Sequence, residues 1–447
     1  MRIFIPGILT ILILFTFVET ADAQLWLADR ESREGPGVKL GKSLVLHFGV
    51  GGELGFDSNA TYAHDPVPAG RLRITPYLDI ATRPIQRMQT IDDSVGAASP
   101  KLIFRFGLAT FYDRYFARDD KEIRDFNSKY NPFGFDSHLN FTLYPERKVS
   151  LSGGLTYIKT LEPYESASDA QGKHNIVPMI SMRFMPGGGT LTIEPKYRLD
   201  LLVFDDKQIG VNSNRFSHEA SVLTSWKILP KTALISNVMF RPTVYFGNLA
   251  QNVDSYPLRS WIGAQGLILE KFGFRALVGY GASFYEYGPN FEGIIGDGAL
   301  MLYIGHSSHA TIGAKRDFVD SFYANYYVMN GGYLSFERIF AGRVQLSVDG
   351  SVYKRIYSYN VGYMQWEGGD VIANTTDRED VWITLSLLGE VRASDWLSFH
   401  LSLKFWKDVS DFSFRYESDS GIVSGESLIT YVNFSKLEIF FGVRGHY

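Results

Sequence analysis

The sequence predicts an all-β fold, a single up-and-down antiparallel transmembrane β-barrel of about 18 strands (16–18). Three observations support this prediction. Apolar and polar residues alternate with a period of two from Ser43 to Tyr447. Most of the alternating runs contain 10–15 residues, whereas strands of soluble proteins usually contain about five or six. Finally, charged residues avoid one of the two faces of these runs.

The composition agrees with a membrane barrel and excludes several other classes. The chain has 447 residues, with 33 Phe, 26 Tyr, 7 Trp, 43 Gly and no Cys. The absence of Cys excludes disulfides, thiolate metal sites, cysteine nucleophiles and a lipoprotein anchor. Lys and Arg number 44 against 48 Asp and Glu, without a basic block, so nucleic acid is not an expected partner.

The first 23 residues have the pattern of a secretory signal peptide. Arg2 precedes an apolar stretch, residues 3–18, and a small-x-small cleavage site follows. A transmembrane anchor is the alternative, but the stretch is short for a membrane span of about 20 residues. We therefore expect an exported chain, in which residues 24–42 form a periplasmic N-terminal lead-in and residues 43–447 form the barrel.

The expected strands follow one another without a domain boundary. Gly, Pro, Asn and Asp separate them, as is typical of turns. The eighteen strands are expected to begin near Ser43, Arg71, Leu102, Phe133, Val149, Asn175, Leu191, Arg215, Thr232, Trp261, Phe272, Phe291, His309, Tyr323, Arg343, Val381, Leu397 and Tyr431.

The connections between these strands alternate in length. Short ones, such as Pro230-Lys231, alternate with mostly longer polar ones, as expected of an outer-membrane barrel with short periplasmic turns and longer external loops. Two connections depart from this rule, because 82–100 is long where a short one is expected and 318–322 is short where a long one is expected. A miscounted pair of strands would explain both. The longest loop, 358–380, is the candidate for a segment that folds inward and constricts a pore.

The distribution of charge between the two faces is the strongest evidence for a barrel. It was counted in five segments: Leu191–Val203, Val344–Val352, Val381–Val391, Leu397–Phe405 and Leu437–Tyr447. The first, third and following alternate residues of each segment make 29 positions without any Asp, Glu, Lys or Arg, whereas the 24 intervening positions carry nine. A Lys or Arg at the bilayer midplane costs about 2–4 kcal/mol, so the charge-free face is the one expected in lipid. A soluble β-sandwich also alternates, but does not predict charge-rich faces on strands this long.

The charged face supplies the candidate functional residues. We expect a mixed-sign ladder along the inner wall of the barrel. It consists of Arg105, Glu194, Lys196, Arg198, Asp200, Arg275, Glu390, Arg392, Lys404, Glu438 and Arg444. Such a wall favours polar solutes over apolar ones. In the alternative interpretation, these residues form ion pairs that only satisfy one another inside a plugged barrel, and the sequence does not decide between the two.

Aromatic residues cluster near the expected ends of the strands. They include Phe111, Tyr112, Tyr115, Phe284, Tyr285, Tyr287, Tyr323, Tyr326, Tyr327, Tyr353, Tyr357 and Tyr359. Their rings suit the headgroup zone of a bilayer, so we expect an outer girdle. Stacking against sugars is the alternative for some of them.

The sequence shows no arrangement typical of a catalytic or metal site. The nine His residues have no HExxH or other metal spacing, and no G-x-S-x-G elbow is present. We therefore expect no cofactor, no metal and no enzymatic activity. If the protein were a hydrolase, Ser398, His400 and Ser402 would be its candidate residues, although a water-filled barrel needs polar residues at such positions in any case.

The last twelve residues, from Lys436 to Tyr447, resemble the final strand of Gram-negative outer-membrane barrel proteins, which typically ends on an aromatic residue. Gly445 departs from this pattern, because an apolar residue is common there. The resemblance implies an integral outer-membrane protein surrounded by lipid and lipopolysaccharide. It also implies that Phe441, Val443 and Tyr447 belong to the signal for the barrel-assembly machinery.

The opening segment Gly51–Asn59 resembles the first strand of a family of β-barrel porins, some of which sit in polysaccharide-export systems. This resemblance implies a channel that passes polar solutes, or a conduit that works with polysaccharide-export proteins. One alternative is a closed surface barrel whose external loops bind partners. The hydrolase is the less favoured alternative.

Overall fold

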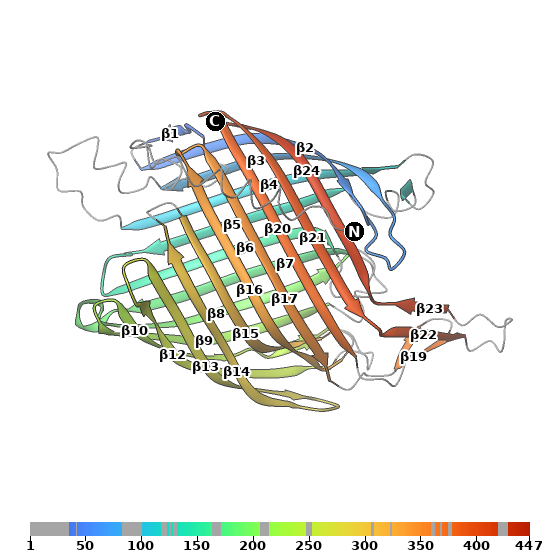
Figure 1. The fold of residues 1–447 in the computed structure, drawn as a ribbon. Helices are drawn as coiled ribbons and strands as arrows, with labels where there is room; N and C mark the ends of the chain where they lie inside the picture. Colours follow the sequence, from blue (N-terminus) through green and yellow to red (C-terminus); the bar gives the residue numbers. More distant parts are fainter. Residues whose placement is uncertain are drawn as a thin grey trace.

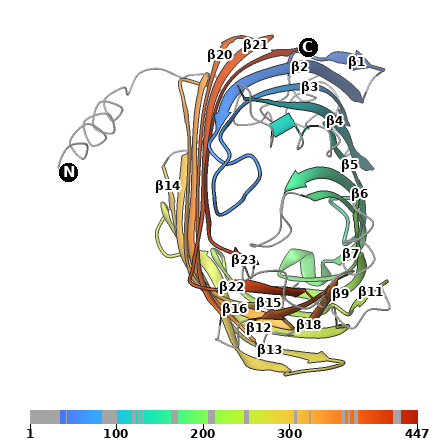
Figure 2. The ribbon, with the colours of Figure 1, turned by 90° about the vertical axis from the view of Figure 1, so that its right-hand side faces the viewer.

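The computed structural model describes residues 35–41, 43–82, 101–117, 123–124, 127, 132–162, 171–205, 214–246, 253–304, 308–321, 324–358, 363–366, 369–373, 378–418 and 428–447. Its main element is one antiparallel sheet closed into a barrel (Figures 1 and 2). Eighteen strands form the wall, in agreement with the predicted number and fold class. They are β2 (Leu44–Asp57), β3 (Ala69–Thr82), β4 (Leu102–Phe116), β5 (Phe133–Leu143), β6 (Val149–Glu162), β7 (Gln171–Phe184), β8 (Leu191–Phe204), β9 (Arg215–Leu229), β10 (Thr232–Phe240) with β11 (Thr243–Tyr245), β12 (Ser255–Leu267), β13 (Phe272–Tyr285), β14 (Phe291–Tyr303), β15 (Ser308–Asp320), β16 (Tyr326–Phe340), β17 (Val344–Tyr357), β20 (Glu379–Ser394), β21 (Leu397–Ser410) and β24 (Phe434–His446).

The barrel closes where its first strand pairs with its last. The pairing of β2 with β24 runs from Gly49 opposite His446 to Asp57 opposite Glu438. Closure satisfies the backbone groups that an open sheet would expose to lipid, where each unpaired group costs several kcal/mol. Because all eighteen strands are accounted for, a miscounted pair of strands does not explain the two connections of unexpected length. Residues 83–100 of the first lie outside the described residues, and the second lies between Asp320 of β15 and Tyr326 of β16.

One strand of the wall is interrupted. β10 and β11 both pair with β9 and with β12, and Arg241 and Pro242 lie between them. Proline has no N–H to donate to a ladder, so it breaks the strand at this point. Pro257 of β12 lies beside the gap, and its carbonyl accepts a hydrogen bond from the Arg241 N–H (2.9 Å). The prediction that β12 begins near Trp261 was wrong by six residues, because Pro257 resembled a strand boundary.

The turns at one end of the barrel are as short as the sequence predicts. Between β16 and β17, Ala341 and Gly342 have φ values of 48° and 64°, and the N–H of Arg343 donates to the carbonyl of Phe340 (3.0 Å). Positive φ at both central residues is the geometry of a type I′ hairpin turn, which matches the twist of the flanking strands. This end, which also carries the C-terminus, is the periplasmic end.

Further elements lie outside the barrel wall. β1 (Val38–Leu40), in the expected lead-in, pairs with the start of β2, whereas the expected signal peptide lies outside the described residues. At the opposite, external end, β18 (Tyr363–Trp366), β19 (Gly369–Ala373), β22 (Ser413–Ser418) and β23 (Leu428–Tyr431) form a second antiparallel sheet (Figure 1). In the described parts of the chain, no helix has the length and apolar character needed to span a membrane.

Candidate functional site

Contacts across several strands identify the inner face of the wall. Arg71 on β3 reaches across β2 to Glu438 on β24, with 3.0 Å between Nη1 and Oε1. Arg275 on β13 reaches across β14 and β15 to the hydroxyl of Tyr333 on β16 (2.9 Å). Side chains converge in this way only on the concave side of a curved sheet. The positions that alternate with these along each strand therefore face outward.

The outward positions are apolar and exposed. Phe48, Val50 and Leu54 on β2 are 42%, 53% and 58% exposed, and Phe441 on β24 is 56% exposed. Lipid covers such a face in a transmembrane barrel, while the polar interior is kept away from hydrocarbon. A closed sheet with these two faces is an integral outer-membrane barrel of the Gram-negative type, as the sequence predicts.

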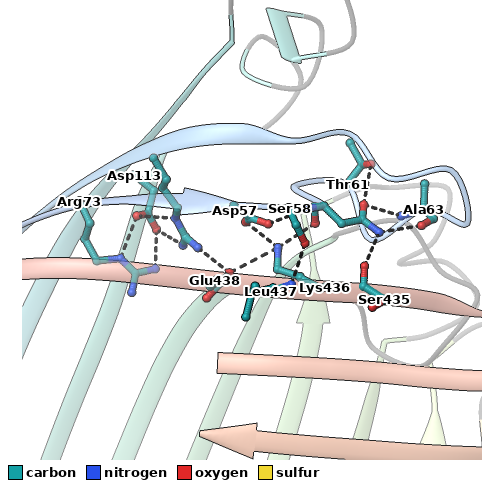
Figure 3. Close-up of polar contacts among 12 residues, drawn as sticks. Asp57, Ser58, Thr61, Ala63, Arg73, Asp113, Ser435, Lys436, Leu437 and Glu438 are labelled. Carbon is teal, nitrogen blue, oxygen red and sulfur yellow. Dashed lines mark hydrogen bonds and ion pairs between the residues drawn. The ribbon is translucent and has the colours of Figure 1, made fainter. Parts of the chain in front are cut away.

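The inner face has a dense group of buried charges at the junction of the first and last strands. Lys436 Nζ lies 2.6 Å from Asp57 Oδ2 and 3.3 Å from Glu438 Oε1. Arg71 joins Glu438 to Asp113 on β4, with 2.9 Å between Nη2 and Oδ2 (Figure 3). We refer to these five residues as the seam cluster. Each charge has an opposite partner, so the cluster links the first strands of the barrel to the last. Its formal charge of −1 is offset by Arg73, which also pairs with Asp113.

The loop 58–68 continues directly from the seam cluster. Asn59 Nδ2 donates to the carbonyls of Ala63 (2.7 Å) and Ser435 (3.2 Å), and the Lys436 ammonium lies 3.9 Å from the centre of the Tyr62 ring. The loop leaves the wall and extends across part of the barrel mouth (blue in Figure 2). The longest candidate for an inward-folding loop, 358–380, contributes β18 and β19 to the second sheet.

The predicted ladder on β8 is partly paired. Asp200 Oδ2 is 3.4 Å from Arg198 Nη2 and 2.9 Å from Arg241 Nη2, and Arg198 Nε is 3.7 Å from Glu219 Oε2. Glu194 and Lys196 share this face. Among the described residues, neither of these two has an ion pair within 4.0 Å.

The remaining predicted residues form separate groups on the same inner wall. Arg444 Nη1 lies 3.0 Å from Glu390 Oε2, and Arg392 Nε lies 3.8 Å from Glu390 Oε1. Elsewhere, Arg105 pairs with Asp79 (3.0 Å) and Arg275 with Asp297 (2.8 Å). Lys404 is exposed, and its ammonium is 5.9 Å from the Trp406 ring centre. The structure thus brings the eleven residues into one wall, in several clusters instead of one continuous ladder.

Two of the predicted assembly-signal residues lie on the outer face of β24, and the third, Tyr447, follows the end of this strand. Phe441, Val443 and Tyr447 are 56%, 36% and 53% exposed. The Tyr447 ring stacks on Phe48 of the first strand, with 5.2 Å between ring centres, and the Tyr447 N–H donates to the Phe48 carbonyl (2.8 Å). Their role in recognition by the assembly machinery stays a prediction.

Sequence reasoning missed four of the five members of the seam cluster. Lys436, Asp57, Asp113 and Arg71 were not singled out, although Lys436 lies two residues before Glu438 and therefore on the same face. The alternation of side chains between the two faces of a strand could have placed each of them inside. It could not show that they meet, because Lys436 and Asp57 are 379 positions apart in the chain.

The expected aromatic girdle was partly wrong. Phe284 and Tyr287 are exposed by 50% and 66%, but Tyr115 and Tyr285 are only 6% and 9% exposed and lie inside. There, Arg71 lies over the Tyr115 ring at 4.9 Å, and the Tyr285 hydroxyl donates to Asp320 (2.8 Å). Neighbouring residues of a strand point to opposite faces, so a cluster along the sequence divides between lipid and lumen. Two of the expected girdle residues, Tyr323 and Tyr359, lie outside the described residues.

Two of the three candidate hydrolase residues take part in structural contacts. Ser398 Oγ lies 2.9 Å from Nε2 of His446, whose Nδ1 lies 2.6 Å from the Tyr77 hydroxyl. Ser398 is 0% exposed. His400 instead pairs with Glu53 (2.8 Å between Nε2 and Oε1). A substrate does not reach Ser398 in this arrangement. The described residues also contain no group of three or more His, Asp and Glu that could hold a metal ion.

Comparison with known proteins gives only distant likenesses. No protein-family model matches the chain, and no curated protein matches its sequence. Acinetobacter baumannii OccAB2 is similar over 91% of this chain and 97% of its own, with 10% identity and a TM-score of 0.46. Pseudomonas aeruginosa OpdK, solved with vanillate, is similar over 90% of this chain and 99% of its own, with 8% identity and a TM-score of 0.45. The Neisseria meningitidis iron transporter FrpB is similar over 96% of this chain and 83% of its own, with 8% identity and a TM-score of 0.39. At TM-scores below 0.5, these likenesses say nothing about the solute of this chain.

Proposed function

We propose that the protein is an outer-membrane channel that lets small polar solutes cross the membrane. The observation that carries this proposal is the charged inner wall of an 18-strand barrel. Charged groups of both signs lie on widely separated strands, from Arg73 on β3 to Lys315 on β15. Barrels of 16–18 strands are wide enough for an aqueous channel, and water in that channel solvates the charged groups that are not buried.

The pairing of these charges determines which solutes are favoured. Opposite charges lie within 4.0 Å of each other in most clusters of the inner wall, for example Arg275 with Asp297 and Arg259 with Asp317. Their fields largely cancel at a distance. We therefore expect weak selectivity between small cations and anions, and a preference for polar over apolar solutes.

Conductance of the refolded protein in planar lipid bilayers tests the proposal. Folding is established first by the heat-dependent shift of the band in gel electrophoresis and by β-type circular dichroism. Discrete current steps are the expected result. If correctly folded protein inserted into the bilayer and no steps appeared, the lumen would be plugged and the channel proposal would fail.

A conduit for exported polysaccharide, with export proteins as partners, is a finer prediction from the resemblance of Gly51–Asn59. The contacts of this segment give it no added support, because they serve the barrel itself. Asp57 belongs to the seam cluster, and Asn59 holds the loop that follows it. Gly55 gives room to the Phe440 ring, which a Cβ at this position would overlap. The polar-solute channel is therefore the form of the function that we favour.

A surface-binding barrel is the second candidate function. Its support is the second sheet, in which β19 from one external loop pairs with β22 from another, from Gly369 opposite Ser418 to Ala373 opposite Phe414. Pairing between two loops gives a larger and more rigid surface than either loop alone. A protein without conductance, whose binding to envelope components is lost when residues 363–373 are replaced by a short linker, would favour this candidate.

A further inference from the structure

A small polar cavity opens in the inner wall where β24, β2, β3, β4 and β5 lie side by side. Its volume is about 160 Å³. Its lining includes Gly51, Glu53, Arg73, Ala109, Asp136 and Arg444. These residues come from five consecutive strands of the wall, so the cavity faces the lumen and has no opening to lipid.

The cavity exists because no neighbouring side chain packs over some of the small residues on this part of the wall. At Gly49 and Gly55, also inward-facing on β2, an added Cβ would overlap the rings of Tyr77 and Phe440. At Gly51, between them, the nearest atoms to such a Cβ would be 3.8 Å away or more. Packing of the wall therefore requires glycine at the outer two positions, whereas Gly51 borders an unfilled space.

One part of the cavity lining offers hydrogen-bond donors with positive charge. Arg73 donates from Nε and Nη2 to Asp113 (2.8 and 2.9 Å), and Arg444 donates from Nη1 to Glu390 (3.0 Å). A guanidinium has five N–H donors, so both residues keep donors beyond these bonds. Their side chains are 27% and 16% exposed, which leaves them accessible from the lumen.

Acceptors with negative charge lie among these donors, since Glu53 is directly opposite Arg73 in the ladder of β2 and β3. Glu53 accepts a hydrogen bond from His400 at Oε1, and its side chain is 20% exposed. Asp136 lines the cavity from β5, four strands away from Arg444. Each carboxylate can accept about four hydrogen bonds. The cavity therefore presents donors and acceptors of opposite charge around a single small volume.

We infer that this cavity is a binding site for a small zwitterion, a molecule of the size of an α-amino acid. Its carboxylate would bind near Arg73 and Arg444, and its ammonium near Glu53 and Asp136. The volume fits, because a cavity of about 150 Å³ holds a molecule of the size of benzene. This inference rests on the proposed channel function and names a class of solute that the channel would take.

Four solutes with the same number of non-hydrogen atoms test the inference. Alanine is a zwitterion, lactate an anion, alaninamide largely a cation at neutral pH, and lactamide is neutral. The concentration of each that halves the ion conductance is measured on single channels. We expect alanine to act at a concentration about tenfold lower than the other three, the gain of roughly one charge-assisted hydrogen bond.

Two variants and their matched controls locate the effect. G51L fills the cavity. In this variant we expect the concentration of alanine that halves the conductance to lie within about twofold of that of lactamide, a smaller difference than one hydrogen bond would give. G52L adds the same side chain to the neighbouring residue, which faces lipid and has no atom within 4 Å of an added Cβ, and should keep the preference. In D136N, alanine and lactate should halve the conductance at equal concentrations. In D349N, at a residue on the inner face of β17, they should not.

The outcomes separate this inference from the channel proposal. Equal action of all four solutes on a conducting wild-type channel would overturn the zwitterion site and leave the channel intact. Equal action of alanine and lactate would show an anion site instead, and would also overturn the inference. An absence of conductance in folded protein would instead overturn the channel proposal itself.

Discussion

Lys436 Nζ lies 2.6 Å from Asp57 Oδ2, and both side chains are 0% exposed. This ion pair joins the last strand of the barrel to the first, next to their final pair in the ladder, Asp57 opposite Glu438. Lys436 also donates to the carbonyl of Asn59 (2.9 Å). A buried charge is stable only with such partners, so the residue that closes the barrel also fixes the start of the loop at its mouth.

Replacement of Lys436 by methionine should strongly destabilise the barrel. Met preserves most of the side-chain volume but leaves Asp57 and Glu438 without their ammonium partner, at an expected cost of about 3–5 kcal/mol. The measurement is the guanidinium midpoint of unfolding in detergent, followed by the heat-dependent gel shift. K231M is the control, since Lys231 is exposed in the short turn between β9 and β10, away from the seam cluster. Equal midpoints for the two variants would contradict the role of Lys436.

Reversal of charge on β8 should change the ion selectivity of a conducting channel. We expect the double variant K196E/R198E to shift the reversal potential in a salt gradient toward cation preference, because both side chains face the lumen. At about 1 M salt the Debye length is only about 3 Å, so charges far from the ion path are screened. R114E, with an exposed residue on the outer face of β4, is the control. Unchanged selectivity of the double variant would mean that β8 does not line the ion path.

Loss of the Asn59 side chain should loosen the loop at the mouth. N59A removes the hydrogen bonds that the side chain donates to the carbonyls of Ala63 and Ser435 and the one that its Oδ1 accepts from the Ala63 N–H, and a typical intramolecular hydrogen bond contributes about 0.5–1.5 kcal/mol. We expect larger current fluctuations and a higher mean conductance. T61A is the control, because its hydroxyl makes only a 3.5 Å contact with Asn59 Oδ1. If N59A and the wild type had the same current noise, the loop would not limit the ion path.

Asp205, which follows the end of β8 at the external rim, should contribute to the stability of the barrel in a pH-dependent way. Its carboxylate accepts a hydrogen bond from His174 (2.6 Å) and lies 3.3 Å from Lys159 Nζ. Burial acts to raise the pKa of Asp205, but these two partners outweigh it and bring the pKa below its usual value. A pKa lowered by folding means that the carboxylate stabilises the fold above its unfolded pKa of about 3.9, and that this contribution is lost as the pH falls through the folded value.

Melting temperatures check this pH dependence. The wild type should melt higher than D205N at about pH 6, and the difference should shrink as the pH falls below the unfolded pKa of about 3.9 and disappear once the folded carboxyl is protonated. D395N, at an exposed residue of a periplasmic turn, should show no comparable difference. If the difference in melting temperature between the wild type and D205N stayed constant down to the lowest pH, the ion-pair explanation would be contradicted.

Much of the fold could be predicted from the sequence because the relevant signals are local. Charges are absent from one face of β8 and β24, and this identifies the lipid-facing side without any knowledge of neighbouring strands. Local signals failed where proline or clustered aromatics gave an ambiguous pattern. Pro257 resembled a boundary inside β12, and Tyr285 was expected outside although strand parity places it inside, beside the outward-facing Phe284.

The sequence by itself determined the fold class, the two faces of the strands and the membrane environment, and it bounded the number of strands at 16–18, since period and charge are properties of each segment alone. Only the tertiary structure decided which charges meet, because register and closure bring together residues as distant as Asp57 and Lys436. It also decided that Gly51 borders a cavity while Gly49 on the same face is covered by Tyr77. That difference depends on side chains from neighbouring strands, whose positions are fixed only when the sheet closes on itself.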